Sequence, residues 1–239
     1  MSQKDNYKPE GKWSFDEGVT KVFEDMISRS IPGYSTMRDC VVRVAYPMLT
    51  KTKSPFLLDL GCSRGETIYQ ILNSLPNQKT VTAVGVDSSK PMIDVATESF
   101  SNFENVNFIH ADLQAADITP GKYSLITSVL TAQFIPLDVR QDFFQKVHSG
   151  LSFDGAFVVV EKILGESPVS QGFLVDIYHT YKSDSGYTEE QIEEKRKALQ
   201  GVLVPLRGSE NERMLKDAGF TNVQRFWQCL NFAGWIAFK

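Results

Sequence analysis

Cysteine and histidine are scarce in this sequence, and neither is arranged for a disulfide framework or a metal site. The 239 residues include 3 cysteines and 3 histidines. Cys40, Cys62 and Cys229 are odd in number and far apart, and no two of them form a C-x-x-C pair. The histidines show none of the spacings typical of metal ligands. We therefore expect no disulfide, no bound metal and a reducing, cytoplasmic compartment.

Long apolar runs and an excess of basic residues are also absent. No run approaches the ~20 apolar residues that a membrane-spanning helix needs, and the opening stretch MSQKDNYKPEGKW lacks the apolar core of a signal peptide. The formal net charge is −4, whereas a surface that binds nucleic-acid phosphates is basic. These absences predict a protein that neither enters a membrane nor binds DNA directly.

The sequence does contain a regular alternation of apolar strands and amphipathic helices. A polar arm at 1–12, expected to be mobile, precedes a helical stretch at 13–50 that is broken at Ser30–Ser35. Strands then follow at FLLDL, TVTAVGVDSS, VNFIHAD, YSLITSVL and AFVVVEKI, with helices between them. Strands that are apolar throughout and alternate with helices form a parallel sheet covered on both faces. The last two strands, VQRFWQCLNF and GWIAFK, are close enough for an antiparallel hairpin.

These elements predict an α/β fold with a doubly wound, seven-stranded, mostly parallel sheet. We expect a helical cap at 1–50 and a sheet domain at 51–239. Within the sheet domain, an insertion at about 166–205 is mostly helical and follows the fifth strand. Ligands bind at the carboxyl ends of the strands in such sheets. The insertion therefore lies where it can act as a lid, and the N-terminal helices can cover the site from the other side.

A glycine turn in PFLLDLGCSRGE follows the first strand. Gly61 and Gly65 let the backbone pass close to a ligand, and the next helix directs its N-terminal amides at it. A pyrophosphate or a carboxylate would suit this position. Ser63 stands where the dinucleotide fingerprint G-x-G-x-x-G has its middle glycine, so the turn departs from that fingerprint. The glycines could also simply cap a tight strand–helix turn.

Acidic residues stand at or near the ends of three successive strands. Asp59 precedes the glycine turn, Asp87 ends the second strand and Asp112 follows the third. A carboxylate about 20 residues beyond the turn is placed to bind ribose hydroxyls, and Asp112 can accept a hydrogen bond from an adenine amino group. Asp87 and Asp112 could instead be N-caps of the following helices. Together with the turn, the three acids predict an adenosyl ligand with an amino-acid tail.

Four segments in register, LDLGCSRG, VGVDSS, HADL and LKDAGF, resemble the Rossmann-like class I S-adenosylmethionine (SAM) transferases. A closer resemblance runs from Trp13 to Lys239 and is carried by WSFDEGVTKVFEDMISRSIPGYS, LTAQF, SGYTEEQIEEKR and QCLNF. Through these pieces the chain is similar to the carboxy-SAM synthase family. That family uses SAM and prephenate to make a SAM with a carboxylate on its methyl carbon, which a partner enzyme uses to modify a tRNA wobble uridine. The resemblance also implies a homodimer and a small-molecule substrate.

The resemblance implies roles for individual residues. The cofactor, SAM or carboxy-SAM, would contact the following residues: Tyr34, Gly61, Cys62, Ser63, Asp87, Ser88, Asp112 and Leu113. We also expect Asp59, Gly65 and Val129 at the cofactor site, and the candidate catalytic residues are Arg196, Tyr34 and His179. Gly61 to Ser63 would line the amino-acid tail, Asp87 and Ser88 the ribose, and Asp112 and Leu113 the adenine. Arg196 would pair with the added carboxylate, for which a planar guanidinium is well suited.

One departure and several alternatives stay open. Val129 stands where the family has an asparagine that contacts the ligand, and Ser128 or Thr131 could replace that contact. Arg196 lies in the charged helix EEQIEEKRKAL, where it could sit on a solvated face. Without carboxy-SAM chemistry the chain would be a methyltransferase acting on a small molecule or nucleoside, with His179, Tyr178 and Glu161 facing the acceptor. A SAM-binding subunit without turnover is the third reading.

Overall fold

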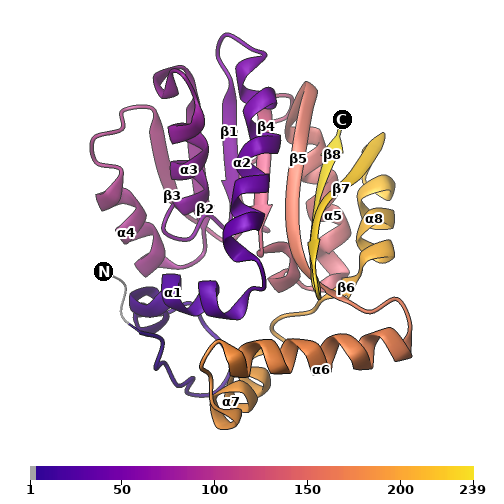
Figure 1. Ribbon diagram of the computed structural model, residues 1–239. Coiled ribbons are helices and arrows are strands. Elements are labelled where there is room, and N and C mark those ends of the chain that lie inside the picture. The colour runs from indigo at the N-terminus through magenta and orange to yellow at the C-terminus, as the bar shows by residue number, and fades with distance from the viewer. Residues whose placement is uncertain (1–3) are drawn as a thin grey trace.

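One mixed sheet organises the chain in the computed structural model, which describes residues 4–239 (Figure 1). Its strands are β1 (Phe56–Leu60), β2 (Thr82–Asp87), β3 (Val106–His110), β4 (Tyr123–Val129), β5 (Leu151–Leu164), β6 (Leu206–Arg207), β7 (Asn222–Cys229) and β8 (Phe232–Phe238). The order along the sheet is β3-β2-β1-β4-β5-β8-β7, and the two-residue β6 pairs with β5 outside this path. The seven strands of the path confirm the predicted architecture.

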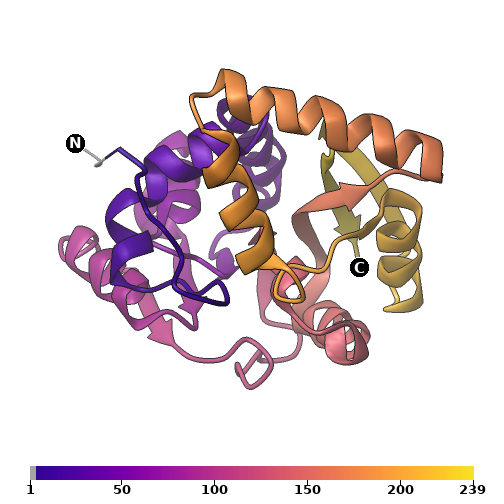
Figure 2. The ribbon, with the colours of Figure 1, turned by 90° about the horizontal axis from the view of Figure 1, so that it is seen from below.

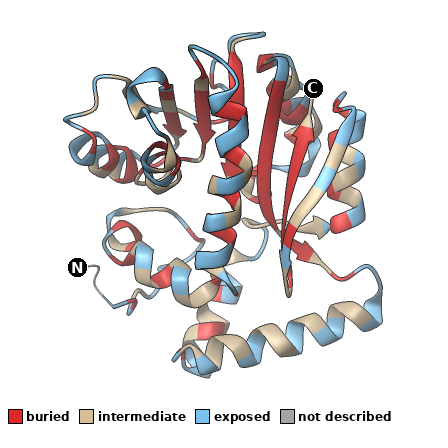
Figure 3. Cartoon of the chain, turned by 45° about the horizontal axis from the view of Figure 1, so that its top comes forward, coloured by how far each residue is buried: buried red, intermediate tan, exposed pale blue. Residues whose placement is uncertain are grey.

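Strand directions also match the sequence pattern. The neighbours from β3 to β5 are parallel, whereas β8 is antiparallel to both β5 and β7. The hairpin of β7 and β8 therefore closes one edge of the sheet. β4 and β5 lie in the middle of the sheet, and both faces of the sheet are covered by helices (Figure 3). β4 and residues 155–161 of β5 are therefore almost entirely buried, whereas Phe153 and Asp154 near the start of β5 are exposed. The continuous apolar runs of the two strands follow from this burial.

Helices cover both faces of the sheet. On one face, α2 (Tyr34–Thr50) and α3 (Glu66–Ser74) share a core with β1 and β5. On the other face, α5 (Leu137–Gly150) and α8 (Gly208–Asp217) pack in a second core around Phe144 and Leu215. The helix α4 (Lys90–Ser99) begins with a Ser89 N-cap and packs beside β3. Two short 3₁₀ helices lie at Gln78–Thr80 and Ala132–Phe134.

Three further helices lie at the carboxyl ends of the parallel strands. They are α1 (Glu17–Ser30), α6 (Pro168–Asp184) and α7 (Glu189–Leu199). Figure 2 views the molecule from this end, with α6 running across it and α7 turning back beneath the strands. Capping boxes at Ser167 and Thr188 begin α6 and α7, so the lid helices are defined by their own sequence. No helix within residues 4–239 is long and apolar enough to cross a membrane.

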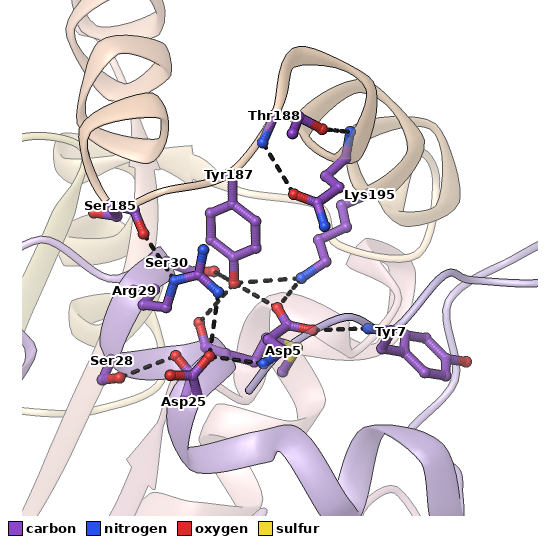
Figure 4. A network of polar contacts seen from close by, with 12 residues as sticks. Asp5, Tyr7, Asp25, Ser28, Arg29, Ser30, Ser185, Tyr187, Thr188 and Lys195 are labelled. Carbon is purple, nitrogen blue, oxygen red and sulfur yellow. Dashed lines mark hydrogen bonds and ion pairs between the residues drawn. The ribbon is translucent and has the colours of Figure 1, made fainter. Parts of the chain in front are cut away.

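The polar arm at the N-terminus differs from its prediction. Residues 1–3 lie outside the described part, but Asp5 is only 1% exposed, so the expectation of a mobile arm is wrong there. Its backbone amide donates a hydrogen bond to Asp25 at 2.8 Å, and its carboxylate accepts hydrogen bonds from Lys195 and Tyr187 (Figure 4). The arm thereby joins α1 to the lid helix α7. A sequence pattern does not reveal such a partner 190 residues away.

Replacing Asp5 with alanine is expected to destabilise the protein. The change leaves Lys195 buried without a counter-charge, and breaking a buried ion pair in this way costs ~3 kcal/mol. Urea unfolding would measure the loss. The matched control is Lys8→Ala, since Lys8 lies on the same arm but is exposed and 3.7 Å from Glu190 and Glu194. Equal losses for the two variants would contradict a structural role of Asp5.

Candidate active site

A cavity of about 700 Å³ lies at the carboxyl edge of the sheet, within the usual size range of small-molecule sites. One wall consists of the loops after β1, β2, β3 and β4. The opposite wall comes from the lid helices α6 and α7, and α1 and α2 supply a third side. The predicted lid segment therefore does face the predicted ligand site. Among residues 4–239, no group of three or more metal-ligating side chains is present.

The glycine turn after β1 is shaped by close contacts. Gly61 has φ +78°, and a Cβ built there would lie 2.1 Å from Thr131 Oγ1. Gly65 has φ +85°, and a Cβ there would lie 2.8 Å from the Phe100 ring. Ser63 also has a positive φ, of 51°, a conformation that costs energy for a residue with a side chain. The turn thus needs glycine at its two predicted positions and holds Ser63 in strain at the cavity wall.

Asp87 links the glycine turn to the end of β2. Its Oδ2 accepts a hydrogen bond from the Ser63 amide at 2.8 Å, and its Oδ1 accepts one from the Ser89 amide at 2.8 Å. Burial raises the pKa of the Asp87 carboxyl, and these amides oppose the shift. Each carboxylate oxygen keeps a free lone pair. Asp87 can therefore hold the turn in place and still accept hydrogen bonds from a ligand's hydroxyl groups.

Most of the predicted site residues border this one cavity. They are Tyr34, Gly61, Cys62, Ser63, Asp87, Ser88, Asp112, Leu113, Val129, His179 and Arg196. Asp59 and Gly65 are not among its lining residues. Asp59 is buried beneath the turn, where it accepts a hydrogen bond from Thr127 at 2.7 Å and burial raises its pKa to about 7. Gly65 instead faces the aromatic side chains of Phe100 and Phe108.

Arg196 borders the cavity from α7 but has an intramolecular partner. Its guanidinium donates two hydrogen bonds to Glu193, at 2.7 and 2.8 Å. This pairing raises the pKa of Arg196 and lowers that of Glu193 to about 2. The Arg196 side chain is 62% exposed, so it lies at the rim of the cavity. A ligand carboxylate would have to replace Glu193.

His179 and Glu161, both weighed as residues facing an acceptor, lie in different places. His179 is exposed on α6, with Nε2 3.1 Å from Glu189 Oε2. Glu161 is not a lining residue of the cavity. It accepts a hydrogen bond from the Ala132 amide at 3.0 Å, and burial raises its pKa to about 8. Its position inside the sheet fits a structural role better than contact with a substrate.

Arg38 is a site residue that the sequence analysis missed. It is 9% exposed and borders the cavity from α2. Its Nε donates to Gln70 at 2.8 Å and its Nη1 to the Tyr34 hydroxyl at 2.9 Å, but its Nη2 has no partner among the described residues. Arg38 also borders, together with Val129, a small adjoining pocket. A charged residue on the apolar face of YSTMRDCVVRVAYPML was the available signal.

Two lysines were missed as well. Lys162 in β5 and Lys182 in α6 border the cavity. Their ammonium nitrogens lie 4.5 and 4.8 Å from the ring centroid of Tyr178. Neither lysine stands out in the sequence, because lysines at a strand end and on a lid helix are usually solvated.

Comparisons with known proteins agree with this geometry. Residues 57–155 match the family model described as a methyltransferase domain. A carboxy-S-adenosyl-L-methionine synthase of Actinobacillus pleuropneumoniae is 34% identical over 96% of this chain and 94% of its own. One of Methylococcus capsulatus is 36% identical over 95% of this chain and 93% of its own.

Solved structures show the same fold at lower identity. Phosphoethanolamine N-methyltransferase 2 of Haemonchus contortus, in complex with SAM, has a TM-score of 0.65 at 15% identity and covers 97% of this chain and 61% of its own. An O-methyltransferase family protein of Burkholderia thailandensis has a TM-score of 0.66 at 14% identity, with 93% and 59% covered. The fold, the cavity and the relatives that match over nearly their whole length place the chain among SAM-dependent transferases. It belongs to the carboxy-S-adenosyl-L-methionine synthase family.

Proposed function

We propose that the protein makes carboxy-SAM from SAM and a small carboxylate donor, and that the donor is prephenate. The observation that carries the proposal is the two-sided cavity. Residues suited to an adenosyl ligand line one wall, and cationic residues of the lid line the other. A volume of about 700 Å³ leaves room for a second small molecule beside a nucleoside. The relatives that match over nearly their whole length, and that are named carboxy-SAM synthases, support the same assignment.

The residues present fit SAM. Without a Cβ at Gly61 the turn allows close approach of an amino-acid tail, and Asp87 keeps lone pairs for ribose hydroxyls. Asp112 lies beyond β3, where it can accept from an adenine amino group. The unpartnered Nη2 of Arg38 is a donor for the carboxylate of the tail. When bound, SAM supplies a methyl group on a positively charged sulfur, which makes the methyl hydrogens acidic.

The chemistry is balanced without an oxidant. Prephenate loses its ring carboxylate as carbon dioxide and its ring hydroxyl as hydroxide, which leaves phenylpyruvate. The carbon dioxide forms a bond to the methyl carbon, and the hydroxide takes the displaced proton to give water. The chain's own part is to hold both reactants and exclude bulk water. Tyr34 lies at the wall beside Arg38, and Arg196 would bind the new carboxylate in place of Glu193.

The destination of the product is part of the proposal. We infer that carboxy-SAM made here serves a partner enzyme that modifies a tRNA wobble uridine, and that the protein acts as a homodimer in the cytoplasm. The partner enzyme and the homodimer follow from the resemblance described above, whereas the cytoplasmic location follows from the few, scattered cysteines. The chain's net charge of −4 favours a small-molecule role over direct contact with tRNA.

A second candidate is methyl transfer to a small molecule or nucleoside. Val129 favours it, since an apolar side chain stands where the resemblance implies a polar ligand contact. Arg38 weakens this argument. It borders the same small pocket as Val129, and its Nη2 supplies a hydrogen-bond donor there. A SAM-binding subunit without turnover would bind SAM tightly and convert nothing.

Deuterium in the methyl group of SAM separates these functions. The purified protein is incubated with prephenate and SAM that carries a fully deuterated methyl group, and the products are weighed by mass spectrometry. Carboxy-SAM synthesis replaces one of the three deuterons, so the product keeps two of them and phenylpyruvate appears in equal amount. An acceptor that gains all three deuterons would establish methyl transfer. Unchanged SAM would exclude carboxy-SAM synthesis from prephenate, and would leave the binding subunit or methyl transfer to an acceptor that is not in the mixture.

Arg196→Ala is expected to weaken carboxy-SAM binding by ~10-fold or more while SAM binding stays within about twofold, since a charge-assisted hydrogen bond contributes about 1.5–3 kcal/mol. Titration calorimetry with each compound measures the difference. Lys197→Ala is the control, because Lys197 is exposed on the same helix and approaches the same Glu193, at 3.5 Å. Equal weakening of both compounds would place Arg196 away from the added carboxylate.

A further inference from the structure

Lys162 and Lys182 bring two positive charges to the cavity without a counter-charge. No ion pair between either lysine and a carboxylate is found within 4.0 Å among the described residues. Both ammonium groups instead make a cation–π contact with the ring of Tyr178. A cation–π contact offsets part of the cost of desolvating a charge but does not neutralise it.

Two other cations of the cavity wall are paired with carboxylates: Lys195 is held by Asp5 and Arg196 by Glu193. Arg38 has no carboxylate partner among the described residues, but its guanidinium donates hydrogen bonds to Gln70 and Tyr34. Besides Arg38, the uncompensated charge lies on Lys162, at the end of β5, and Lys182, on the lid. Lys162 belongs to the sheet and Lys182 to the lid insertion. A ligand bound between them would contact both parts of the cavity wall.

The protein holds this pair at an energetic cost. Burial lowers the pKa of Lys162 to about 8, and burial together with the charge of Lys162 lowers that of Lys182 to about 7. Neighbouring lysines inside a cavity repel each other and lose hydration. An anion would relieve both penalties. The surrounding side chains include Leu174, Tyr178 and Phe232, which suit the carbon skeleton of an organic anion.

We propose that Lys162 and Lys182 form the binding site of a small organic dicarboxylate, the second substrate of the reaction. The inference rests on the proposed function, in which the donor gives up one carboxylate and keeps the other. Two unpaired lysines match the two negative charges of such a molecule. After transfer only one carboxylate remains, so the spent donor is held by a single negative charge and leaves more easily.

The test separates binding from turnover. S-adenosylhomocysteine has no methyl group to react, so protein loaded with it can be titrated calorimetrically with prephenate without conversion. Wild type is expected to bind prephenate at least 10-fold more tightly than Lys162→Met or Lys182→Met. Lys182→Arg should restore most of the affinity. Lys197→Met, an exposed lysine on α7 outside the cavity lining, is expected to bind like wild type.

Two readouts show that the methionine variants are folded. Affinity for S-adenosylhomocysteine should stay within about twofold of wild type. The melting temperature of the ligand-free protein should stay level or rise, because an unpaired, desolvated charge has been removed. A variant that loses prephenate binding and also S-adenosylhomocysteine binding would overturn a specific role for that lysine.

Other probes define the class of anion. Phenylpyruvate, with one carboxylate, and inorganic phosphate are expected to bind at least 10-fold more weakly than prephenate. Tighter binding of phosphate would overturn the dicarboxylate assignment. Unchanged prephenate affinity in both methionine variants, or no prephenate binding by wild type at millimolar concentration, would overturn the site. If prephenate binds through the lysines but no carboxy-SAM forms from SAM, the proposed function fails and the anion site stands.

The pH dependence gives an independent check. An anion binds the protonated lysines, so prephenate affinity should fall as the pH rises from 7 to 9, through the pKa values of about 7 and about 8. Among the described residues, the other titratable groups that act on the pair are Tyr178, which is on α6 with Lys182, and Lys195 on α7. Burial raises the pKa of Tyr178 above this range. Replacing Lys182 with methionine should flatten the profile near pH 7, and an unaltered profile would contradict the proposal.

Discussion

Replacing Gly61 with alanine is expected to reduce the affinity for SAM and S-adenosylhomocysteine by ~100-fold or more, about 2.7 kcal/mol. The new Cβ would lie 2.1 Å from Thr131 Oγ1 and 2.2 Å from its Cγ2. The turn must therefore move away from Thr131, into the space where the amino-acid tail of SAM would lie. Titration calorimetry with S-adenosylhomocysteine measures the loss.

Two comparisons isolate the contact at Gly61 from the cost of its backbone conformation. Gly121 has φ +70° and nothing within 4 Å of an added Cβ, so Gly121→Ala carries the conformational strain without a clash. We expect that variant to lose some stability and to bind SAM normally. Combining Gly61→Ala with Thr131→Ala should recover part of the affinity. Normal binding by Gly61→Ala alone would mean that the turn does not touch the ligand.

Replacing Arg38 with methionine is expected to weaken S-adenosylhomocysteine binding by ~10- to 100-fold, the effect of losing a charge-assisted hydrogen bond of about 1.5–3 kcal/mol. The buried guanidinium has an unpartnered Nη2 and borders the cavity beside Tyr34. A ligand carboxylate is the partner that would satisfy it. Calorimetric titration measures the affinity, and Arg43→Met, on the exposed side of the same helix, serves as the control.

A ligand without the amino-acid tail tells direct contact from general damage. Methylthioadenosine carries the adenosyl group but no carboxylate. Its affinity should be the same for wild type and Arg38→Met. If both ligands weaken equally, Arg38 supports the cavity wall through Gln70 and Tyr34 and does not bind the tail.

The sheet was predictable because its signals are local. Apolar strands such as FLLDL and YSLITSV must be buried on both faces, and the capping residues Ser167 and Thr188 mark the starts of the lid helices. The glycine turn and Asp87 were also readable, since a positive φ and a strand-end carboxylate depend on neighbours in the chain. Of these residues, Gly61 and Asp87 border the same cavity.

The burial of the N-terminal arm and the surroundings of the charged cavity residues depend on contacts between distant segments. Asp5 is buried only because Lys195 and Tyr187 meet it, and its local sequence is that of an exposed arm. Arg38 stands out only as a charged residue on the apolar face of its helix, and the helix pattern around Lys182 does not show that Lys182 lacks a carboxylate partner. For Arg196 the sequence left a solvated face and a carboxylate contact open, and the structure places it at the rim, paired with Glu193. Its role in binding stays a prediction.

The mass of the small molecule released from the purified, denatured protein tests the central claim most directly. Carboxy-SAM synthesis predicts an adenosyl compound equal to SAM with one methyl hydrogen replaced by a carboxyl group, and its loss in Arg196→Ala. Release of only SAM or S-adenosylhomocysteine, even after the protein has been supplied with SAM and prephenate, would contradict the proposed function.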